Sequence, residues 1–76
     1  EFMETSDKEV LAYERVKDDD RIFVVLNLSS KEIDATITLN HKFVGTNVFT
    51  NEDIILSEGE NNLQLKPWDF LIYEKQ

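Results

Sequence analysis

The fold of this chain is decided by one stretch, Arg21-Ile22-Phe23-Val24-Val25-Leu26-Asn27-Leu28-Ser29. Five consecutive positions in it, 22–26, are apolar, and most are β-branched or aromatic, which favours a strand over a helix. Because side chains on a strand alternate between its faces, both faces of this strand are apolar. The expected faces are Ile22, Val24, Leu26 and Leu28 on one side, and Phe23 and Val25 on the other. We therefore expect the central strand of a small sheet that is covered on both sides.

Further extended segments flank this strand and are separated from one another by polar turns. They are residues 9–16, 32–39, 43–50, 54–56, 62–66 and 68–74. In the first of them, Glu, Leu and Ala also suit a helix, but Val10, Tyr13 and Val16 favour a strand. Residues 32–39 alternate between apolar and polar side chains, as a half-buried antiparallel strand does. Turn signals at roughly 8–12-residue spacing predict an all-β sandwich or a partly closed barrel.

Glycine and proline mark three positions in this pattern. Gly45 lies inside an expected strand and indicates a bulge or a bend. Gly59 lies in a polar turn and is free to adopt a positive φ. Pro67 cannot donate a hydrogen bond to a neighbouring strand and therefore marks a strand boundary.

Composition limits the classes of function. Seventy-six residues make one domain, which buries roughly 60% of its unfolded surface. The net charge is -8, from 16 acidic and 8 basic residues, and argues against nucleic acid and anionic membrane surfaces as partners. No cysteine is present, so neither a disulfide nor a thiolate metal site is available. The compartment stays open, with the cytoplasm slightly favoured.

The first residues differ in character from the rest. Glu1-Phe2-Met3 resembles a cloning scar, and residues 4–8 are polar, so we expect a loose segment over residues 1–8. The folded domain is then expected over residues 9–76. A scar at this position predicts that the chain was excised from a longer protein.

Catalytic chemistry is not indicated by the sequence. Asp18, Asp19 and Asp20 lack the ligand alternation and the glycine of an EF-hand loop, and we interpret them as a hairpin turn. His41 is the only histidine, and we interpret it as a solvated turn residue. The acidic residues fall mainly in turns and at strand ends, where solubility alone explains them. We therefore predict no catalytic residue, no metal site and no cofactor.

Trp68 is the weak candidate for a carbohydrate-binding residue. It follows Pro67 at a strand edge, where an exposed aromatic ring could stack on a sugar. The favoured interpretation is that Trp68 packs in the core or against a neighbouring domain, because one tryptophan is a large part of so small a core.

Three stretches in order carry a resemblance to a known family. They are Val10-Leu11-Ala12-Tyr13-Glu14-Arg15, then residues 22–29, then Leu65-Lys66-Pro67-Trp68-Asp69-Phe70-Leu71-Ile72-Tyr73. Their order and spacing resemble the C-terminal β domain of α-amylase family glycoside hydrolases, in the branch of oligo-1,6-glucosidase, α-glucosidase and cyclomaltodextrinase-like enzymes. Residues 46–51 are similar to the middle of that domain, and the likeness covers about residues 9–74.

The resemblance implies a small antiparallel Greek-key β-sandwich of about seven to eight strands that follows a (β/α)₈ catalytic barrel. The barrel carries the catalytic carboxylates, and none of their motifs occurs in this chain. The main hypothesis is therefore a non-catalytic domain that stabilises the barrel of an α-glucan-processing enzyme. It predicts an apolar surface patch larger than a typical monomer exposes.

Two alternatives remain beside that hypothesis. One is a carbohydrate-binding module for α-glucans, which requires two or more exposed, coplanar aromatic rings. The other is an interaction module that self-associates weakly through the apolar patch or an edge strand.

Overall fold

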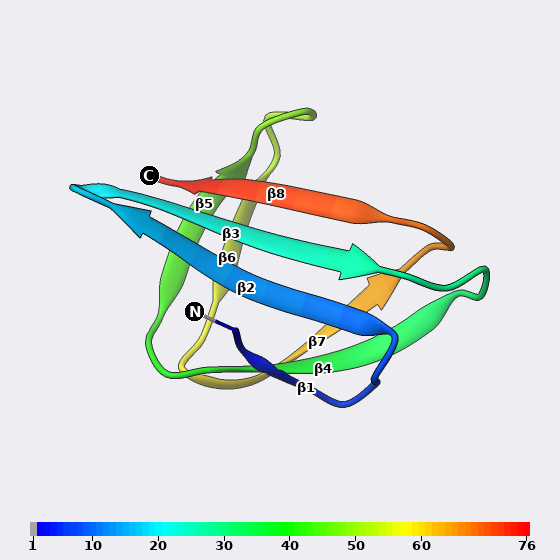
Figure 1. Ribbon diagram of the computed structural model, residues 1–76. Helices are drawn as coiled ribbons and strands as arrows, with labels where there is room; N and C mark the ends of the chain where they lie inside the picture. Colours follow the sequence, from blue (N-terminus) through cyan, green and yellow to red (C-terminus); the bar gives the residue numbers. More distant parts are fainter. Residues whose placement is uncertain (1) are drawn as a thin grey trace.

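The computed structural model describes residues 2–76, which form eight strands and no helix in two packed antiparallel sheets (Figure 1). The strands are β1 Glu4–Thr5, β2 Val10–Lys17, β3 Asp20–Asn27, β4 Ile33–Leu39, β5 Phe43–Asn47, β6 Asp53–Leu56, β7 Gly59–Leu65 and β8 Phe70–Lys75. One sheet has the order β2-β3-β8-β5-β6 and the other the order β1-β4-β7. The predicted all-β sandwich is confirmed. No helix in residues 2–76 is long and apolar enough to cross a membrane.

The strand predicted to be central, β3, lies inside the five-stranded sheet between β2 and β8. Its predicted faces are confirmed: Phe23 and Val25 are fully buried against the three-stranded sheet. On the other face Ile22 and Leu26 are half-buried, and only Val24, paired with Tyr13 and Ile72, is buried, at 7% exposed. The expected cover on both sides is wrong for the described residues, because the second sheet lies on one side of β3 only.

The core fills the space between the sheets, and alternation along the strands supplies it. From β4 it takes Ile33, Ala35, Ile37 and Leu39, the face that the sequence predicts, and from β2 it takes Val10 and Ala12. The Phe23 ring lies 5.5 Å from the Phe43 ring and 6.4 Å from the Tyr73 ring, measured between centroids. Burying each such aromatic or aliphatic side chain stabilises the fold by about 1.5–3 kcal/mol.

Most connections pass from one sheet to the other, as a Greek-key arrangement requires (Figure 1). The hairpins within a sheet are β2–β3 and β5–β6. The acidic turn closes the β2–β3 hairpin with Asp18 at φ 55, which confirms the predicted turn.

Several strand boundaries differ from the prediction, and three of the larger differences have a clear local origin or consequence. Strand β5 ends at Asn47 instead of Thr50, because the Asn47 Oδ1 accepts hydrogen bonds from the backbone N–H of Phe49 (2.8 Å) and Thr50 (3.1 Å) and turns the chain. Strand β7 already begins at Gly59, whose φ of 98 confirms the predicted positive angle. Strand β8 begins at Phe70, so Trp68 belongs to the preceding turn.

Gly45 serves close packing and forms neither a bulge nor a bend. It pairs in regular register with Ile54 on β6 and Lys75 on β8. A Cβ atom at this position would lie 2.5 Å from the Phe43 ring and 2.9 Å from the carbonyl oxygen of Glu74. The close approach of a ring and a backbone therefore requires glycine here.

The segment before residue 9 is more ordered than expected. Glu4–Thr5 form β1 and pair with β4, and Met3 packs against the core while its N–H donates to the Ala12 carbonyl at 2.9 Å. Glu1, the first residue of the predicted cloning scar, lies outside the described residues. The division into residues 1–8 and 9–76 stays a prediction.

Candidate functional site

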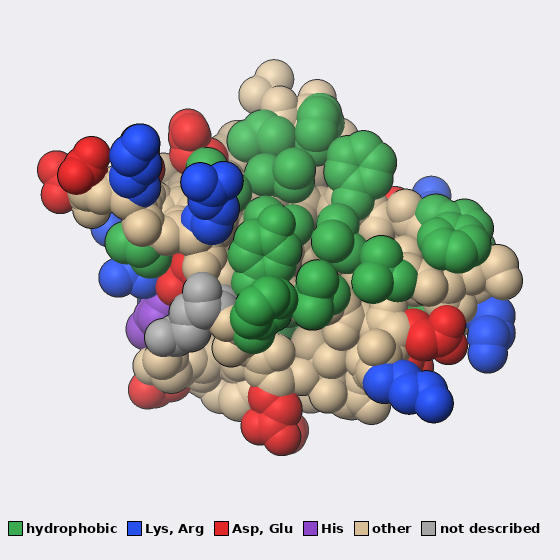
Figure 2. Space-filling model, in the orientation of Figure 1, with side chains coloured by type: hydrophobic (Ala, Val, Ile, Leu, Met, Phe, Trp, Pro, Cys, Tyr) green, Lys and Arg blue, Asp and Glu red, His purple; other side chains and the backbone are tan. Residues whose placement is uncertain are grey.

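The outer face of the five-stranded sheet, which points away from the three-stranded sheet, is apolar. Two rows of cross-strand neighbours run over it, Leu11–Leu26–Phe70 and Tyr13–Val24–Ile72, and Ile22 lies beside them. We call these seven residues the outer apolar face. Figure 2 shows one continuous hydrophobic area over β2, β3 and β8, the strands that carry these residues. Their alternation with the buried residues of the same strands follows from the pleat.

Two further aromatic rings extend this surface at opposite edges. Phe2 lies on Tyr13 with ring centroids 5.6 Å apart, and Phe49 meets Phe70 edge-on at 5.5 Å. Phe49 is 62% exposed and Phe70 is 56% exposed. Contiguous apolar patches of more than a few hundred Å² are rare on monomers and mark sites of interaction. An apolar patch is therefore present on this face, and its predicted excess over the patch of a typical monomer stays a prediction.

The opposite side of the sandwich is polar. The outward residues of β4 and β7 are Asp34, Thr36, Thr38, Glu60, Asn62 and Gln64. A hollow of about 390 Å³ on this side is lined by the polar residues Glu4, Thr5, Ser6, Thr36, Thr38 and Glu60. The two outer faces of the sandwich therefore differ in polarity, and only the face of the five-stranded sheet suits contact with an apolar surface.

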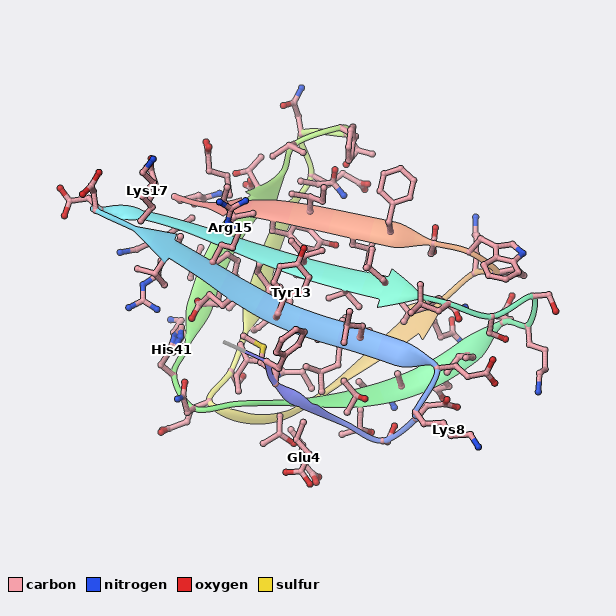
Figure 3. All side chains as sticks on the ribbon, in the orientation of Figure 1. Glu4, Lys8, Tyr13, Arg15, Lys17 and His41 are labelled. Atoms are coloured by element: carbon pink, nitrogen blue, oxygen red, sulfur yellow. The ribbon has the colours of Figure 1, made fainter. Side chains whose placement is uncertain are left out.

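Cations border one end of the outer apolar face. Arg15 and Lys17 follow Tyr13 on β2 at spacings of two residues, so they lie on the same side of the strand (Figure 3). Their charges restrict the partner, because an acidic group opposite them would fix how the apolar faces align.

The sugar-platform candidate, Trp68, is not a core residue. Trp68 is 63% exposed, so it does not pack in the core, and packing against a neighbouring domain, the other part of the favoured interpretation, stays a prediction. The turn that carries it is held by hydrogen bonds from Trp68 N to the Ser29 carbonyl (3.0 Å) and from Lys66 N to the Asp69 carboxylate (2.9 Å). A platform of coplanar rings is not formed by the exposed phenylalanines, since Phe49 and Phe70 are perpendicular at 88°.

A charged cluster lies between β2, β3 and the β4–β5 connection. Glu14 is only 5% exposed, and its Oε1 lies 3.0 Å from both Arg21 Nη1 and His41 Nε2. The His41 Nδ1 lies 2.9 Å from the Lys42 carbonyl oxygen. The hydrogen bond to this carbonyl, and then the contact with Glu14, raise the pKa of His41 above its usual 6.5. His41 does lie in the predicted turn, but its ring is bonded on both sides and only 33% exposed, so the interpretation of it as a solvated residue is wrong.

Sequence reasoning missed this cluster because its members are far apart along the chain. His41 is 27 residues from Glu14, and nothing in the local pattern connects them. Arg21 and His41, which both contact Glu14, are basic. Such contacts neutralise a buried charge and differ from the paired carboxylates of a glycosidase. Among residues 2–76 no group of three or more His, Cys, Asp or Glu could hold a metal ion.

Comparison with known proteins places this fold and surface in a family context. A family model described as "Maltogenic Amylase, C-terminal domain" matches residues 1–72. The match therefore runs over β1 to β7 and into β8. No curated protein matches the chain.

Proposed function

Because this chain belongs to the family of maltogenic amylase C-terminal domains, within the α-amylase family, we propose that it is a non-catalytic domain that stabilises a catalytic (β/α)₈ barrel. The parent protein is then an α-glucan-processing glycoside hydrolase. The α-glucosidase type is the finer part of this proposal, and hydrolysis of maltose and isomaltose by the parent tests it.

The observation that carries the proposal is the outer apolar face. A C-terminal domain of an amylase-family chain is linked to a catalytic domain, so that domain is the nearest partner available to cover Leu11, Leu26 and Phe70. Covering about 300 Å² of apolar surface contributes about 7 kcal/mol before the cost of restricting the two domains. That gain is comparable to the whole stability of a small domain.

Replacement of Phe70 by serine tests the proposal. Because Phe70 is exposed in the 76-residue chain, we expect Phe70→Ser to leave the unfolding temperature of that chain nearly unchanged. In the full-length parent the same change removes a buried aromatic contact and lowers the unfolding temperature by several degrees. The matched control is Gln64→Ser on the polar side, which changes neither. An unchanged parent, or equal losses in both proteins, would contradict docking through this face.

A carbohydrate-binding module is the second candidate function, and the exposure of Trp68 favours it. Trp68 is the only tryptophan, so its fluorescence reports on this one turn. Titration of the 76-residue chain with maltooligosaccharides gives a saturable spectral shift if the indole stacks on a sugar. An unchanged spectrum leaves the docking function as the single proposal.

A further inference from the structure

Trp68 adopts a backbone conformation that tryptophan rarely tolerates. Positive φ angles occur in the described residues at Asp18 (55), Asn51 (64), Gly59 (98) and Trp68 (58). Glycine has no Cβ to clash in this region, and Asp and Asn are the other residues that enter it routinely. A bulky residue there is an outlier. Three of these four positions therefore carry the residue type that the backbone favours, and Trp68 does not.

The surrounding turn holds Trp68 in this conformation. Besides the Ser29 contact, the Asn27 Nδ2 donates to the Lys66 carbonyl at 2.8 Å, and the Asn27 N–H donates to the Asp69 carbonyl at 2.8 Å. Asn27 is 1% exposed, so the turn is tied to the interior of the sandwich. Strained residues persist where the structure around them determines their conformation, and they concentrate at functional positions.

The indole contributes little to the fold that holds it. Its side chain is 63% exposed and does not belong to the core cluster. No stacking of another aromatic ring on Trp68 is found within residues 2–76. A strained backbone that presents an unused apolar side chain indicates a contact with another surface.

The position of the β7–β8 turn identifies that surface. Trp68 precedes Phe70 by two residues, and Phe70 belongs to the outer apolar face. Figure 2 shows a second, smaller hydrophobic group over this turn on the same side as that face, separated from it by the backbone and by side chains that are neither hydrophobic nor charged. Arg15 and Lys17 border the face on β2 (Figure 3).

We propose that Trp68 is a second anchor of the docking interface, inserted into an apolar pocket on the catalytic domain of the parent protein. The inference rests on the proposed function and adds a specific contact to it. The outer apolar face supplies area, whereas a single indole set apart from that face limits rotation of one domain against the other. Tryptophan is among the residues that dominate binding when they are buried at an interface.

The test compares Trp68→Asn in two proteins. In the 76-residue chain, asparagine suits the positive φ, so we expect an unfolding temperature equal to that of the unmodified chain or up to about 4 °C higher. In the full-length parent, loss of the anchor raises the fraction of undocked domain about 30-fold, as expected for an interface residue of this class. The rate at which a protease releases the C-terminal domain from the native parent measures that fraction. An unchanged or higher unfolding temperature of the 76-residue chain, together with faster release from the parent, distinguishes an anchor from a structural residue.

A matched control changes a residue at a similar positive φ without removing an aromatic ring. Asn51→Gly changes another exposed residue with a similar φ and leaves the release rate of the parent unchanged. Trp68→Gly serves as the second variant if the asparagine variant of the parent fails to accumulate.

The outcomes separate the inference from the proposed function. If Phe70→Ser speeds release and Trp68→Asn does not, the second anchor is wrong and the docking function stands. If neither variant speeds release, both are wrong. If Trp68→Asn lowers the unfolding temperature of the 76-residue chain and of the full-length parent equally, Trp68 is a structural residue and the inference is overturned. A saturable shift of Trp68 fluorescence with maltooligosaccharides in the 76-residue chain overturns it as well, because the indole then serves a glucan.

Discussion

Glu14 is the residue whose surroundings differ most from what its place in the sequence indicates. A carboxylate that is 5% exposed is costly unless basic groups compensate its charge, and Arg21 and His41 do so from 3.0 Å. Both ring nitrogens of His41 face oxygen acceptors, Glu14 Oε1 and the Lys42 carbonyl. The protonated imidazole satisfies both acceptors, since both of its nitrogens donate. Arg21 Nη1, 3.2 Å from Nε2, can donate to that nitrogen when it is neutral.

The stability of the chain should therefore depend on the charge of His41. Its pKa in the folded state is raised above 6.5, mainly by the hydrogen bond to the Lys42 carbonyl and then by Glu14. Because the folded-state pKa is raised, protonated His41 stabilises the folded chain fully below about pH 6. This contribution to the free energy of unfolding is lost as the pH rises through the folded-state pKa. We expect the urea midpoint to fall between about pH 6 and pH 8.

His41→Gln is the control for this pH dependence, because glutamine cannot titrate and the fall should disappear. Since His41 is the only histidine, its NMR titration gives the pKa directly. A measured pKa at or below 6.5 would contradict the prediction.

Asn27 joins two connections through its amide. Its Nδ2 donates at 2.8 Å to the carbonyl oxygens of both Lys31 and Lys66. Asn27→Asp keeps the shape but points a carboxylate oxygen at carbonyl oxygens, so we expect a loss of about 3 kcal/mol in the free energy of unfolding. Urea denaturation measures the loss. Asn62→Asp on the exposed side of β7 is the control and should change stability by no more than about 0.5 kcal/mol.

At the scale of the elements, the alternation of side chains in the sequence predicts which face of a strand is buried. It does not predict the residue at which a strand ends. Strand β4 follows its predicted faces along its whole length. Strand β5 stops three residues early, because one side chain, Asn47, bonds to the backbone that follows it. A pattern with a period of two identifies the face of a strand, whereas a single capping contact decides where the strand ends.

The pairing of β5 with β8 depends on Gly45. A methyl group there would meet the Phe43 ring and, at 2.9 Å, the carbonyl oxygen of Glu74 on β8. Because the carbonyl belongs to the backbone, β8 itself would have to move, and we expect Gly45→Ala to destabilise the chain by about 2 kcal/mol in urea denaturation. Gly59→Ala is the comparison variant: a Cβ at Gly59 has nothing within 4 Å, so its cost comes from the φ of 98 alone, whereas the cost of Gly45→Ala comes from the contacts with Phe43 and Glu74. A Gly45→Ala variant as stable as the unmodified chain would show that β5 and β8 can separate without cost.

At the scale of the whole molecule, two opposing surface properties determine association of the isolated chain. The outer apolar face favours contact between copies, and the net charge of -8 opposes it. Salt screens the charge and strengthens apolar contacts, so we expect weak self-association that increases with salt. Sedimentation velocity across a wide concentration range measures it.

The Phe49→Ser variant distinguishes the surface that is responsible for this association. It removes an exposed ring beside Phe70 and should weaken association through the outer apolar face. Association that persists in this variant, or that decreases with salt, would indicate pairing through an edge strand such as β6 instead.

The sequence by itself determined the class of fold, the positions of most strands and the two faces of each, because alternation and turn residues are local signals that survive without knowledge of the partner strands. The family came from the resemblance of three ordered stretches to a known domain and from the family match over residues 1–72. Tertiary structure alone decided which apolar face of β3 is covered by the second sheet and which is left to a partner. It also decided that Glu14, Arg21 and His41 meet and that Trp68 is turned outward. Those outcomes depend on the order of strands in the two sheets, and that order is set by packing between residues far apart in the chain.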